Sequence, residues 1–213
     1  MTTADQACGP VYTKHFIPLE SNPDVFTELA HKLGLSTSLV FEDVLSLDDP
    51  ELLGFLPRPA FALILVFPTT DDYEKRVQDE DAKLEEFRTS GGADGNSIIA
   101  QLLDASLTPD SDELANNGLE RAYAGVASKG DTEAPLNAED EVDYHYIAFV
   151  KSAKDSHLYQ LDGDRKRPID LGALTTDEDV LSEKCLGVIR GMMASEEENP
   201  NFSLMALVEQ ADM

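Results

Sequence analysis

The stretch 60–67 is an unbroken run of eight apolar residues that ends at Pro68. A short apolar run bounded by proline is typical of a strand that is buried on both faces. The preceding Pro57-Arg58-Pro59 forces the chain to enter this strand in an extended conformation. A membrane-spanning helix needs about 20 apolar residues, which no run in the chain approaches. We therefore expect an interior strand at 60–67 and no membrane span.

Helix-capping and turn signals predict the elements around this strand. Asn22-Pro23-Asp24 predicts a helix start, because asparagine caps, proline fits the first turn and a carboxylate suits the positive end of the helix dipole. This helix should reach Lys32 or Leu33 and end at Gly34. The other predicted elements are strands at 39–45, 144–150, 157–161, 168–169 and 202–208, and helices at 50–56, 97–107, 109–127 and 177–195.

Two of the predicted helices have unusual sequences. The stretch 71–88 is highly charged and predicts a solvated helix on the outside of the fold. Asn116-Asn117-Gly118 predicts a break within the helix at 109–127. Strands with helices between and after them, in a chain of 213 residues, indicate one α/β or α+β domain.

The chain is strongly acidic, with 42 acidic and 16 basic side chains and a formal net charge of −26 at pH 7. Such a surface repels phosphate backbones, which excludes the usual electrostatics of nucleic-acid binding. It would steer a basic partner, although an acidic surface can also serve only to keep a protein soluble. We expect no nucleic-acid partner and leave a basic protein partner open.

The cysteine content and the first residues indicate the compartment. The only cysteines are Cys8 and Cys185, too few for the disulfide framework of a secreted protein. Residues 1–11 are polar and lack the positive charge and apolar run of a signal peptide. We expect a cytoplasmic location, with the nucleus as an alternative, and an N-terminal extension at 1–15.

A histidine and an aspartate stand on two successive predicted strands. His145 lies in the alternating stretch 142–150, and Asp162 ends the short strand after it. An imidazole held by a carboxylate commonly serves a cysteine or serine nucleophile. The same two residues could form a structural contact in a core, so they do not establish a function by themselves.

Five motifs occur in a fixed order around these two residues. They are PLESNPDVF at 18–26, PRPA at 57–60 with FP at 67–68, TEAP at 132–135, VDYH at 142–145 and LYQLDG at 158–163. Together they resemble the ubiquitin carboxyl-terminal hydrolases, which are papain-like cysteine deubiquitinases. The resemblance implies an α/β (α+β) papain-like cysteine protease fold, with a central antiparallel sheet flanked by helices. It also implies a single catalytic domain at 16–210.

The resemblance assigns roles to the histidine and the aspartate. In the family, the histidine of the fourth motif is the general base and acid, and the aspartate of the fifth orients it; these positions are His145 and Asp162. The implied activity is thiol-dependent removal of small adducts from the C-terminal glycine of ubiquitin. The implied partner is ubiquitin or a ubiquitin-like protein.

The chain departs from the family between Phe67 and Ala134. Family members carry there a glutamine that donates to the oxyanion and an Asn-Ala-Cys-Gly segment whose cysteine, the nucleophile, opens a long central helix. Here the chain passes from Arg88 through a glycine-rich stretch into 97–103, which resembles the family's segment after that helix. We therefore expect an internal deletion near 91–97, a missing central helix and an inactive chain.

Neither cysteine of this chain replaces the nucleophile. Gln6-Ala7-Cys8-Gly9 echoes the missing tetrapeptide, but Pro10 argues against a helix there, and Thr2 stands where the family has its glutamine. Cys185 shares an apolar helix face with Leu181 and Ile189, which predicts a buried side chain. We assign no nucleophile.

The resemblance also implies carboxylates that face ubiquitin. The matching positions are Glu20, Asp24 and Asp43, although each could be ordinary solvated surface and Asp24 also suits the first turn of a helix. The loop 128–141 matches the crossover loop of the family. The histidines and cysteines have no metal-ligand spacing, so we expect no metal and no other cofactor. We expect a monomer.

Three interpretations remain open for this chain. It is an inactive relative of these hydrolases, a pseudoenzyme that binds ubiquitin without cleaving it, or a product that does not fold stably. A lost central helix would remove several hundred Å² of buried apolar surface, which at about 25 cal/mol per Å² approaches a stability of about 5 to 15 kcal/mol. Exon loss, a faulty gene model or an engineered deletion would each produce this sequence.

Overall fold

A computed structural model describes residues 19–68, 70–82, 112–127, 129, 144–165, 167–196 and 201–211. These residues form a six-stranded sheet in the order β1-β6-β2-β3-β4-β5, and every neighbouring pair is antiparallel. The strands are β1 (Leu39–Asp43), β2 (Ala62–Pro68), β3 (Tyr144–Lys151), β4 (His157–Asp162), β5 (Ile169–Ala173) and β6 (Ser203–Glu209).

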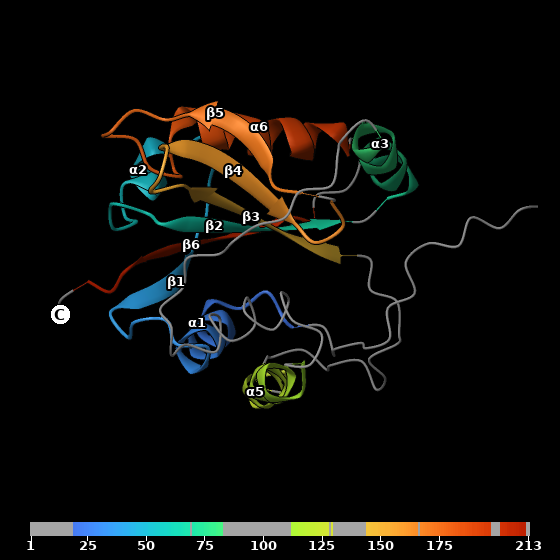
Figure 1. Ribbon diagram of the computed structural model, residues 1–213. Helices are drawn as coiled ribbons and strands as arrows, with labels where there is room; N and C mark the ends of the chain where they lie inside the picture. Colours follow the sequence, from blue (N-terminus) through green and yellow to red (C-terminus); the bar gives the residue numbers. More distant parts are fainter. Residues whose placement is uncertain are drawn as a thin grey trace, which may run out of the picture.

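Helices lie on both sides of this sheet. They are α1 (Pro23–Lys32), α2 (Pro50–Leu53), α3 (Asp71–Asp81), α5 (Asp112–Ala124) and α6 (Glu183–Ser195). Figure 1 shows α2, α3 and α6 on one side of the sheet and α1 and α5 on the other. None of the helices in the described part of the chain is long and apolar enough to span a membrane.

The local signals at α1 act as the sequence predicts. Asn22 accepts hydrogen bonds from the backbone N–H groups of Asp24 and Val25, at 3.0 and 3.4 Å, and Pro23 fills the first turn. Gly34 follows the helix with a φ of 102°, which a residue without a side chain adopts at low cost. The predicted start and end of this helix are confirmed.

One face of the central strands forms the main core. Leu63, Leu65 and Phe67 of β2 are fully buried, and their cross-strand partners on β3 are Phe149, Ile147 and His145. Cys185, Leu186 and Ile189 of α6 cover this face, together with Tyr73 and Val77 of α3. We call it the covered face; His145 lies at its end.

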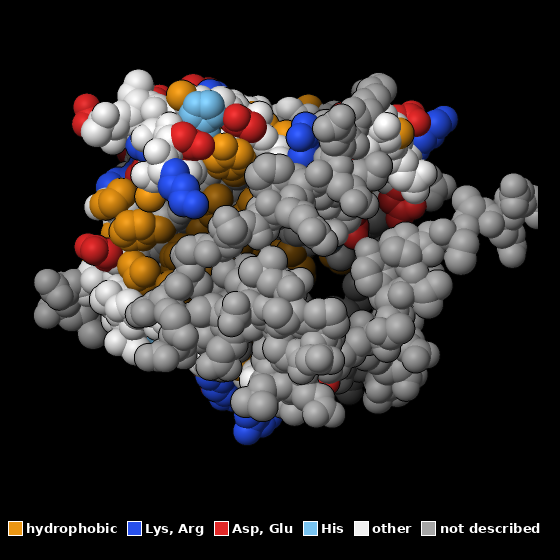
Figure 2. Space-filling model, viewed as in Figure 1, with side chains coloured by type: hydrophobic (Ala, Val, Ile, Leu, Met, Phe, Trp, Pro, Cys, Tyr) orange, Lys and Arg blue, Asp and Glu red, His pale blue; other side chains and the backbone are white. Residues whose placement is uncertain are grey.

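The opposite face of the same strands is apolar but only partly covered. Cross-strand pairing brings together Ile64 of β2, Ala148 of β3 and Leu161 of β4. Ile64 and Ala148 are partly exposed, and Leu161 is 37% exposed. Helix α1 covers one end of this face, where Phe26 packs against Phe41 and Tyr146 with ring centroids 5.8 and 5.4 Å apart. Figure 2 shows hydrophobic side chains gathered at the surface on the left of the view. Strand β2 was predicted to be buried on both faces. This is confirmed for the covered face, whereas the opposite face is only partly buried.

Three helix predictions were wrong in detail. Helix α3 is not merely solvated, because Tyr73 and Val77 are buried in the core. Helix α5 runs through Asn116-Asn117-Gly118 without a break, since a mid-helix glycine costs only about 1 kcal/mol and packing around Val126 offsets it. Helix α6 begins at Glu183 rather than near residue 177. The Ser182 hydroxyl caps this start by accepting a hydrogen bond from the Cys185 N–H.

Several predictions fall outside the described residues. They are the helix at 97–107, the deletion near 91–97, the environment of Cys8 and, except for 129, the loop 128–141.

The two faces of β2 should differ in their response to truncation. Leu65→Ala, on the covered face, should lower the free energy of unfolding by about 2 to 5 kcal/mol, because it opens a cavity in the core. Ile64→Ala, one residue away on the opposite face, should cost at least about 1 kcal/mol less. Urea unfolding of both variants measures the difference; equal losses would contradict the partial cover of that face.

Candidate active site

The pairing of β3 with β4 places the predicted histidine and aspartate together. Asp162 lies directly opposite Ile147, two residues along β3 from His145. Side chains two residues apart on a strand share a face, so His145 and Asp162 are diagonal neighbours across the two strands. Strand β3 begins at Tyr144 and β4 ends at Asp162, so both residues stand at the same end of the sheet.

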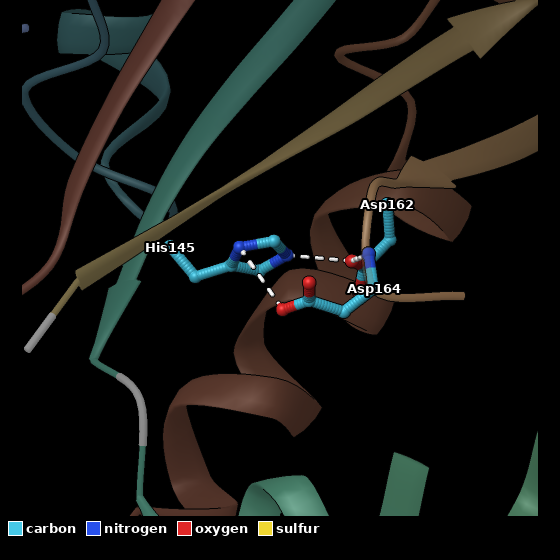
Figure 3. A group of neighbouring side chains, drawn as sticks. All are labelled: His145, Asp162 and Asp164. Carbon is cyan, nitrogen blue, oxygen red and sulfur yellow. Dashed lines mark hydrogen bonds and ion pairs between the residues drawn. The ribbon is translucent and has the colours of Figure 1, made fainter. Parts of the chain in front are cut away.

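The two side chains are in direct contact. The Nε2–H of His145 donates to Oδ1 of Asp162 over 2.5 Å (Figure 3). The His145 side chain is 17% exposed and that of Asp162 is fully buried. This contact orients the imidazole and leaves Nδ1 as the ring nitrogen that can meet a reacting group.

A second carboxylate stands at that other nitrogen. Oδ2 of Asp164, in the turn after β4, lies 3.5 Å from Nδ1 of His145, and its side chain is about half exposed. The backbone N–H of Asp164 donates to Oδ1 of Asp162 over 2.9 Å. The imidazole is thus held between two carboxylates, an arrangement that the sequence reasoning did not include.

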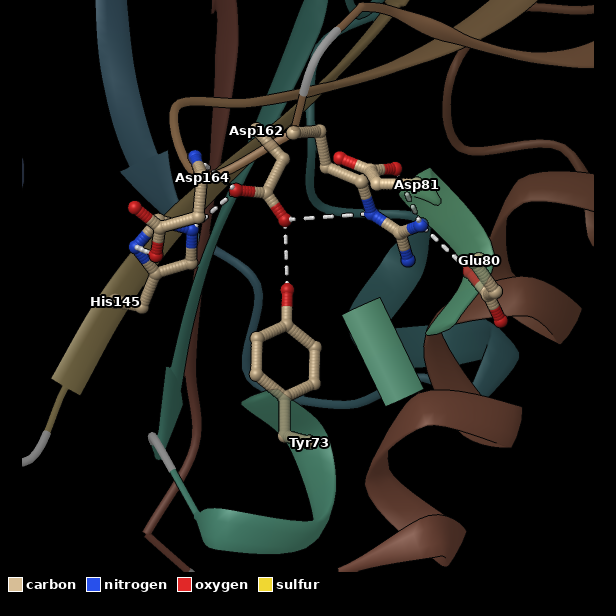
Figure 4. Close-up of polar contacts among 7 residues, drawn as sticks. Tyr73, Glu80, Asp81, His145, Asp162 and Asp164 are labelled. Carbon is tan, nitrogen blue, oxygen red and sulfur yellow. Dashed lines mark hydrogen bonds and ion pairs between the residues drawn. The ribbon is translucent and has the colours of Figure 1, made fainter. Parts of the chain in front are cut away.

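A tyrosine and an arginine complete the surroundings of Asp162 (Figure 4). The Tyr73 hydroxyl donates to Oδ2 of Asp162 over 2.6 Å. Nε of Arg165 lies 4.0 Å from the same oxygen, and its Nη1 donates to Glu80 over 2.5 Å. Sequence reasoning missed Tyr73 because it treated 71–88 as solvated. The sequence did contain a sign that this helix has a buried side. Tyr73 and Val77 are the only apolar residues of α3, and their four-residue spacing places them on one helix face.

The electrostatics favour a charged His145–Asp162 contact. Burial lowers the pKa of His145, but the hydrogen bond to Asp162 and the charges of Asp162 and Asp164 outweigh it and raise the pKa above its usual range. Burial raises the pKa of Asp162, but hydrogen bonds from His145 and Tyr73 outweigh it and hold the pKa below its usual range. Burial, reinforced by Asp162, also raises the pKa of Tyr73, so its hydroxyl remains a donor.

Among the described residues, Cys185 is the one cysteine, and it is unsuited to be a nucleophile. Its side chain is fully buried in the core. Burial and the nearby charge of Asp179 raise its pKa to about 12, so the thiol stays protonated at neutral pH. The prediction that Cys185 is a small buried hydrophobe is confirmed.

Metal binding does not fit this site well. His145, Asp162 and Asp164 each offer a ligand atom, and these atoms lie within 4.8 Å of one another. The Asp162 oxygens, however, already accept hydrogen bonds from His145, Tyr73 and the Asp164 backbone. Nδ1 of His145 and the Asp164 carboxylate would remain, fewer than the three protein ligands that catalytic zinc usually has.

The carboxylates predicted to face ubiquitin lie near the same end of the sheet. The Ser21 hydroxyl is 2.8 Å from that of Ser203, and the Val44 N–H donates to the Leu204 carbonyl over 2.8 Å. The neighbouring residues Glu20 and Asp43 therefore lie close to the start of β6. Val66 of β2 pairs with both Ser203 and Tyr146, the residue after His145. Asp24 is exposed in the first turn of α1.

The chain is similar to proteins of one family. The model of the family described as ubiquitin carboxyl-terminal hydrolase, family 1, matches residues 16–99 and 88–194. A ubiquitin carboxyl-terminal hydrolase of Aplysia californica is 32% identical over 217 aligned positions, which cover 87% of this chain and 98% of that protein. A probable ubiquitin carboxyl-terminal hydrolase of Dictyostelium discoideum is 28% identical over 233 positions, covering 92% and 89%.

A solved structure shares the fold. The catalytic domain of UCH37 from Trichinella spiralis, bound to ubiquitin vinyl methyl ester, superposes with a TM-score of 0.59 at 23% identity, covering 93% of this chain and 97% of that one. The expected papain-like α/β fold, with an antiparallel sheet flanked by helices, is confirmed.

The alignments are longer than this chain. The alignment with the Dictyostelium relative has 233 positions, more than the 213 residues of this chain. Some positions must therefore be gaps in this chain, and the relative has residues there that this chain lacks. The family model matches in two segments that overlap at 88–99, the stretch where the sequence predicts a deletion.

The raised pKa of His145 predicts a pH-dependent stability. Its protonated form stabilises the folded protein fully below the unfolded pKa of about 6.5, and this contribution is lost as pH rises through the higher folded pKa. The Tm difference between the unaltered chain and His145→Gln should therefore shrink from about pH 6 to about pH 9. Calorimetry measures this Tm difference. The same comparison made with Asp162→Asn present in both proteins should show a smaller change with pH. A difference that stays constant with pH would contradict the expected charge on His145.

Proposed function

Since this chain belongs to the ubiquitin carboxyl-terminal hydrolase family of cysteine hydrolases, we propose that His145 is its general base and acid and that Asp162 orients it. We propose further that the chain does not itself cleave ubiquitin adducts, because it lacks the nucleophile. The observation that carries this is the direct contact of His145 with a fully buried Asp162, while a carboxylate rather than a thiol stands at Nδ1.

The geometry of His145 and Asp162 fits the general acid–base pair of a thiol protease. With Nε2 bonded to Asp162, Nδ1 would take the proton of a thiol and later return it to the leaving amine. The carboxylate keeps the imidazole in the required tautomer and stabilises the imidazolium that forms. The raised pKa of His145 favours that imidazolium.

The missing nucleophile is supported by three observations. Cys185 is buried and stays protonated at neutral pH. The aligned Dictyostelium relative contains residues that this chain lacks. The family match consists of two segments that overlap at 88–99, and the sequence there is glycine-rich where the resemblance leads us to expect a cysteine-bearing segment.

Ubiquitin binding without cleavage is the second candidate function. It is favoured by Glu20 and Asp43, which lie at the same end of the sheet as His145, and by the net charge of −26. Ubiquitin vinyl methyl ester is bound to the Trichinella relative with the same fold. We propose ubiquitin or a ubiquitin-like protein with a basic surface as the partner of this face.

Turnover of a fluorogenic ubiquitin C-terminal amide tests the loss of activity. We expect no hydrolysis above buffer, because removing the nucleophile from such a unit costs about a million-fold in kcat. Turnover that disappears in His145→Ala would contradict the proposal. Cys8→Ser and Cys185→Ser, assayed in parallel, would then show which thiol reacts.

Titration with fluorescently labelled ubiquitin tests the binding function. Replacing Glu20, Asp24 and Asp43 with Gln, Asn and Asn should weaken binding about 3-fold or more at low salt, and less at high salt. The control carries the same charge change at the exposed Glu51, Asp177 and Glu209, far from the start of β6, and should bind like the unaltered chain. Absence of saturable binding would contradict the binding function. Equal weakening in the test variant and the control variant would contradict a specific role for Glu20, Asp24 and Asp43.

A further inference from the structure

The buried carboxylate of Asp162 has two chemically different sides. Oδ1 accepts from the His145 imidazole over 2.5 Å and from the Asp164 backbone N–H over 2.9 Å. Oδ2 accepts from the Tyr73 hydroxyl over 2.6 Å, while Arg165 at 4.0 Å is beyond hydrogen-bonding distance. The rotation of the Asp162 carboxylate, which sets where Oδ1 meets His145, therefore depends on the group that binds Oδ2.

Packing holds the Tyr73 ring independently of that hydrogen bond. The ring lies 4.8 Å, centroid to centroid, from Phe67, the cross-strand neighbour of His145. The guanidinium of Arg76 lies 5.5 Å from the centre of the Tyr73 ring. A phenylalanine at position 73 could keep these contacts and lose only the hydroxyl.

Helix α3 is itself anchored to the end of α6. The buried Glu196, at the C-terminal cap of α6, accepts a hydrogen bond from Thr70 over 2.6 Å and one from Arg76 over 3.3 Å. Thr70 also caps α3 by accepting from the Tyr73 N–H over 3.1 Å. The tyrosine hydroxyl is therefore positioned by a helix that is anchored to α6 and does not belong to the sheet.

We propose that Tyr73 is a positioning residue for the His145–Asp162 contact. Its hydroxyl fixes the rotation of the Asp162 carboxylate so that Oδ1 meets Nε2 of His145 and Nδ1 is left for the reacting group. This inference rests on the proposed role of His145 as general base. The Tyr73 hydroxyl touches no reacting atom and acts through Asp162, while the Tyr73 ring lies 6.4 Å, centroid to centroid, from the His145 ring.

The charged groups around Asp162 define what else can influence it. His145 faces it from β3, and Asp164 and Arg165 face it from the turn after β4. From α3, Glu80 and Asp81 contact Arg165 rather than Asp162, at 2.5 and 3.5 Å. Removing the Tyr73 hydroxyl changes none of these charges, so its effect reports on the hydrogen bond alone.

NMR of the full chain tests the proposal without requiring turnover. In the unaltered chain, the Nε2 proton of His145 should give a low-field signal, assigned by its loss in His145→Gln. In Tyr73→Phe this signal should broaden or vanish through exchange with water, and the pKa of Asp162, followed by its carboxyl ¹³C shift, should rise by about one unit or more. Tyr159→Phe is the matched control, because Tyr159 also donates to an aspartate, Asp155, over 3.0 Å, outside the site.

The outcomes separate this inference from the proposed function. If the signal is absent from the unaltered chain, the His145–Asp162 contact fails, and the proposed role of His145 as general base fails with it. If the signal is present but Tyr73→Phe leaves it and the Asp162 pKa unchanged, the positioning role alone is overturned. Should Tyr73→Phe not fold, 3-fluorotyrosine at position 73, a stronger donor, should lower the Asp162 pKa, and an unchanged value would overturn the proposal.

Discussion

The buried carboxylate of Asp162 is the constraint on which the candidate site depends. A buried charge without partners costs several kcal/mol, so the fold must bring donors to it. Three elements supply them: the imidazole of His145 from β3, the hydroxyl of Tyr73 from α3 and a backbone N–H from the turn after β4. A change in strand register would remove the His145 donor, and a change in the position of α3 would remove the Tyr73 donor. The site and the fold therefore stabilise each other.

The two faces of the sheet have different consequences for this protein. The covered face carries the main core, to which α3 and α6 contribute, and it ends at His145. Tyr73 of α3 holds Asp162 from this side. The opposite face exposes part of Ile64 and Leu161, in a chain shorter than its alignment to a relative. Loss of a segment that covers this face would therefore lower stability without dismantling the His145–Asp162 contact. Under the proposed function, this separation would let the His145–Asp162 contact persist in a chain without a nucleophile.

Electrostatics connect the site with the surface around it. Asp162 and Asp164 stand at the two nitrogens of the His145 ring and favour its protonated form. If the chain lacks the nucleophile, as we propose, that charge contributes to folding rather than to catalysis. The acidic surface nearby, which includes Glu20 and Asp43, would retain its attraction for a basic partner. Binding of such a partner is the property that we propose this chain retains.

The sequence by itself determined whatever depends on a few neighbouring residues. The cap at Asn22, the strand that became β2 and the ordered motifs around His145 and Asp162 are local patterns, and the motifs also identified the family. Only the tertiary structure decided that Tyr73 and Asp164 join the site. Tyr73 lies 89 residues from Asp162, and its burial depends on how α3 packs against Phe67. Caps and periodicity act within one or two turns of chain, whereas contacts between distant residues depend on strand register and helix packing, which no local pattern specifies.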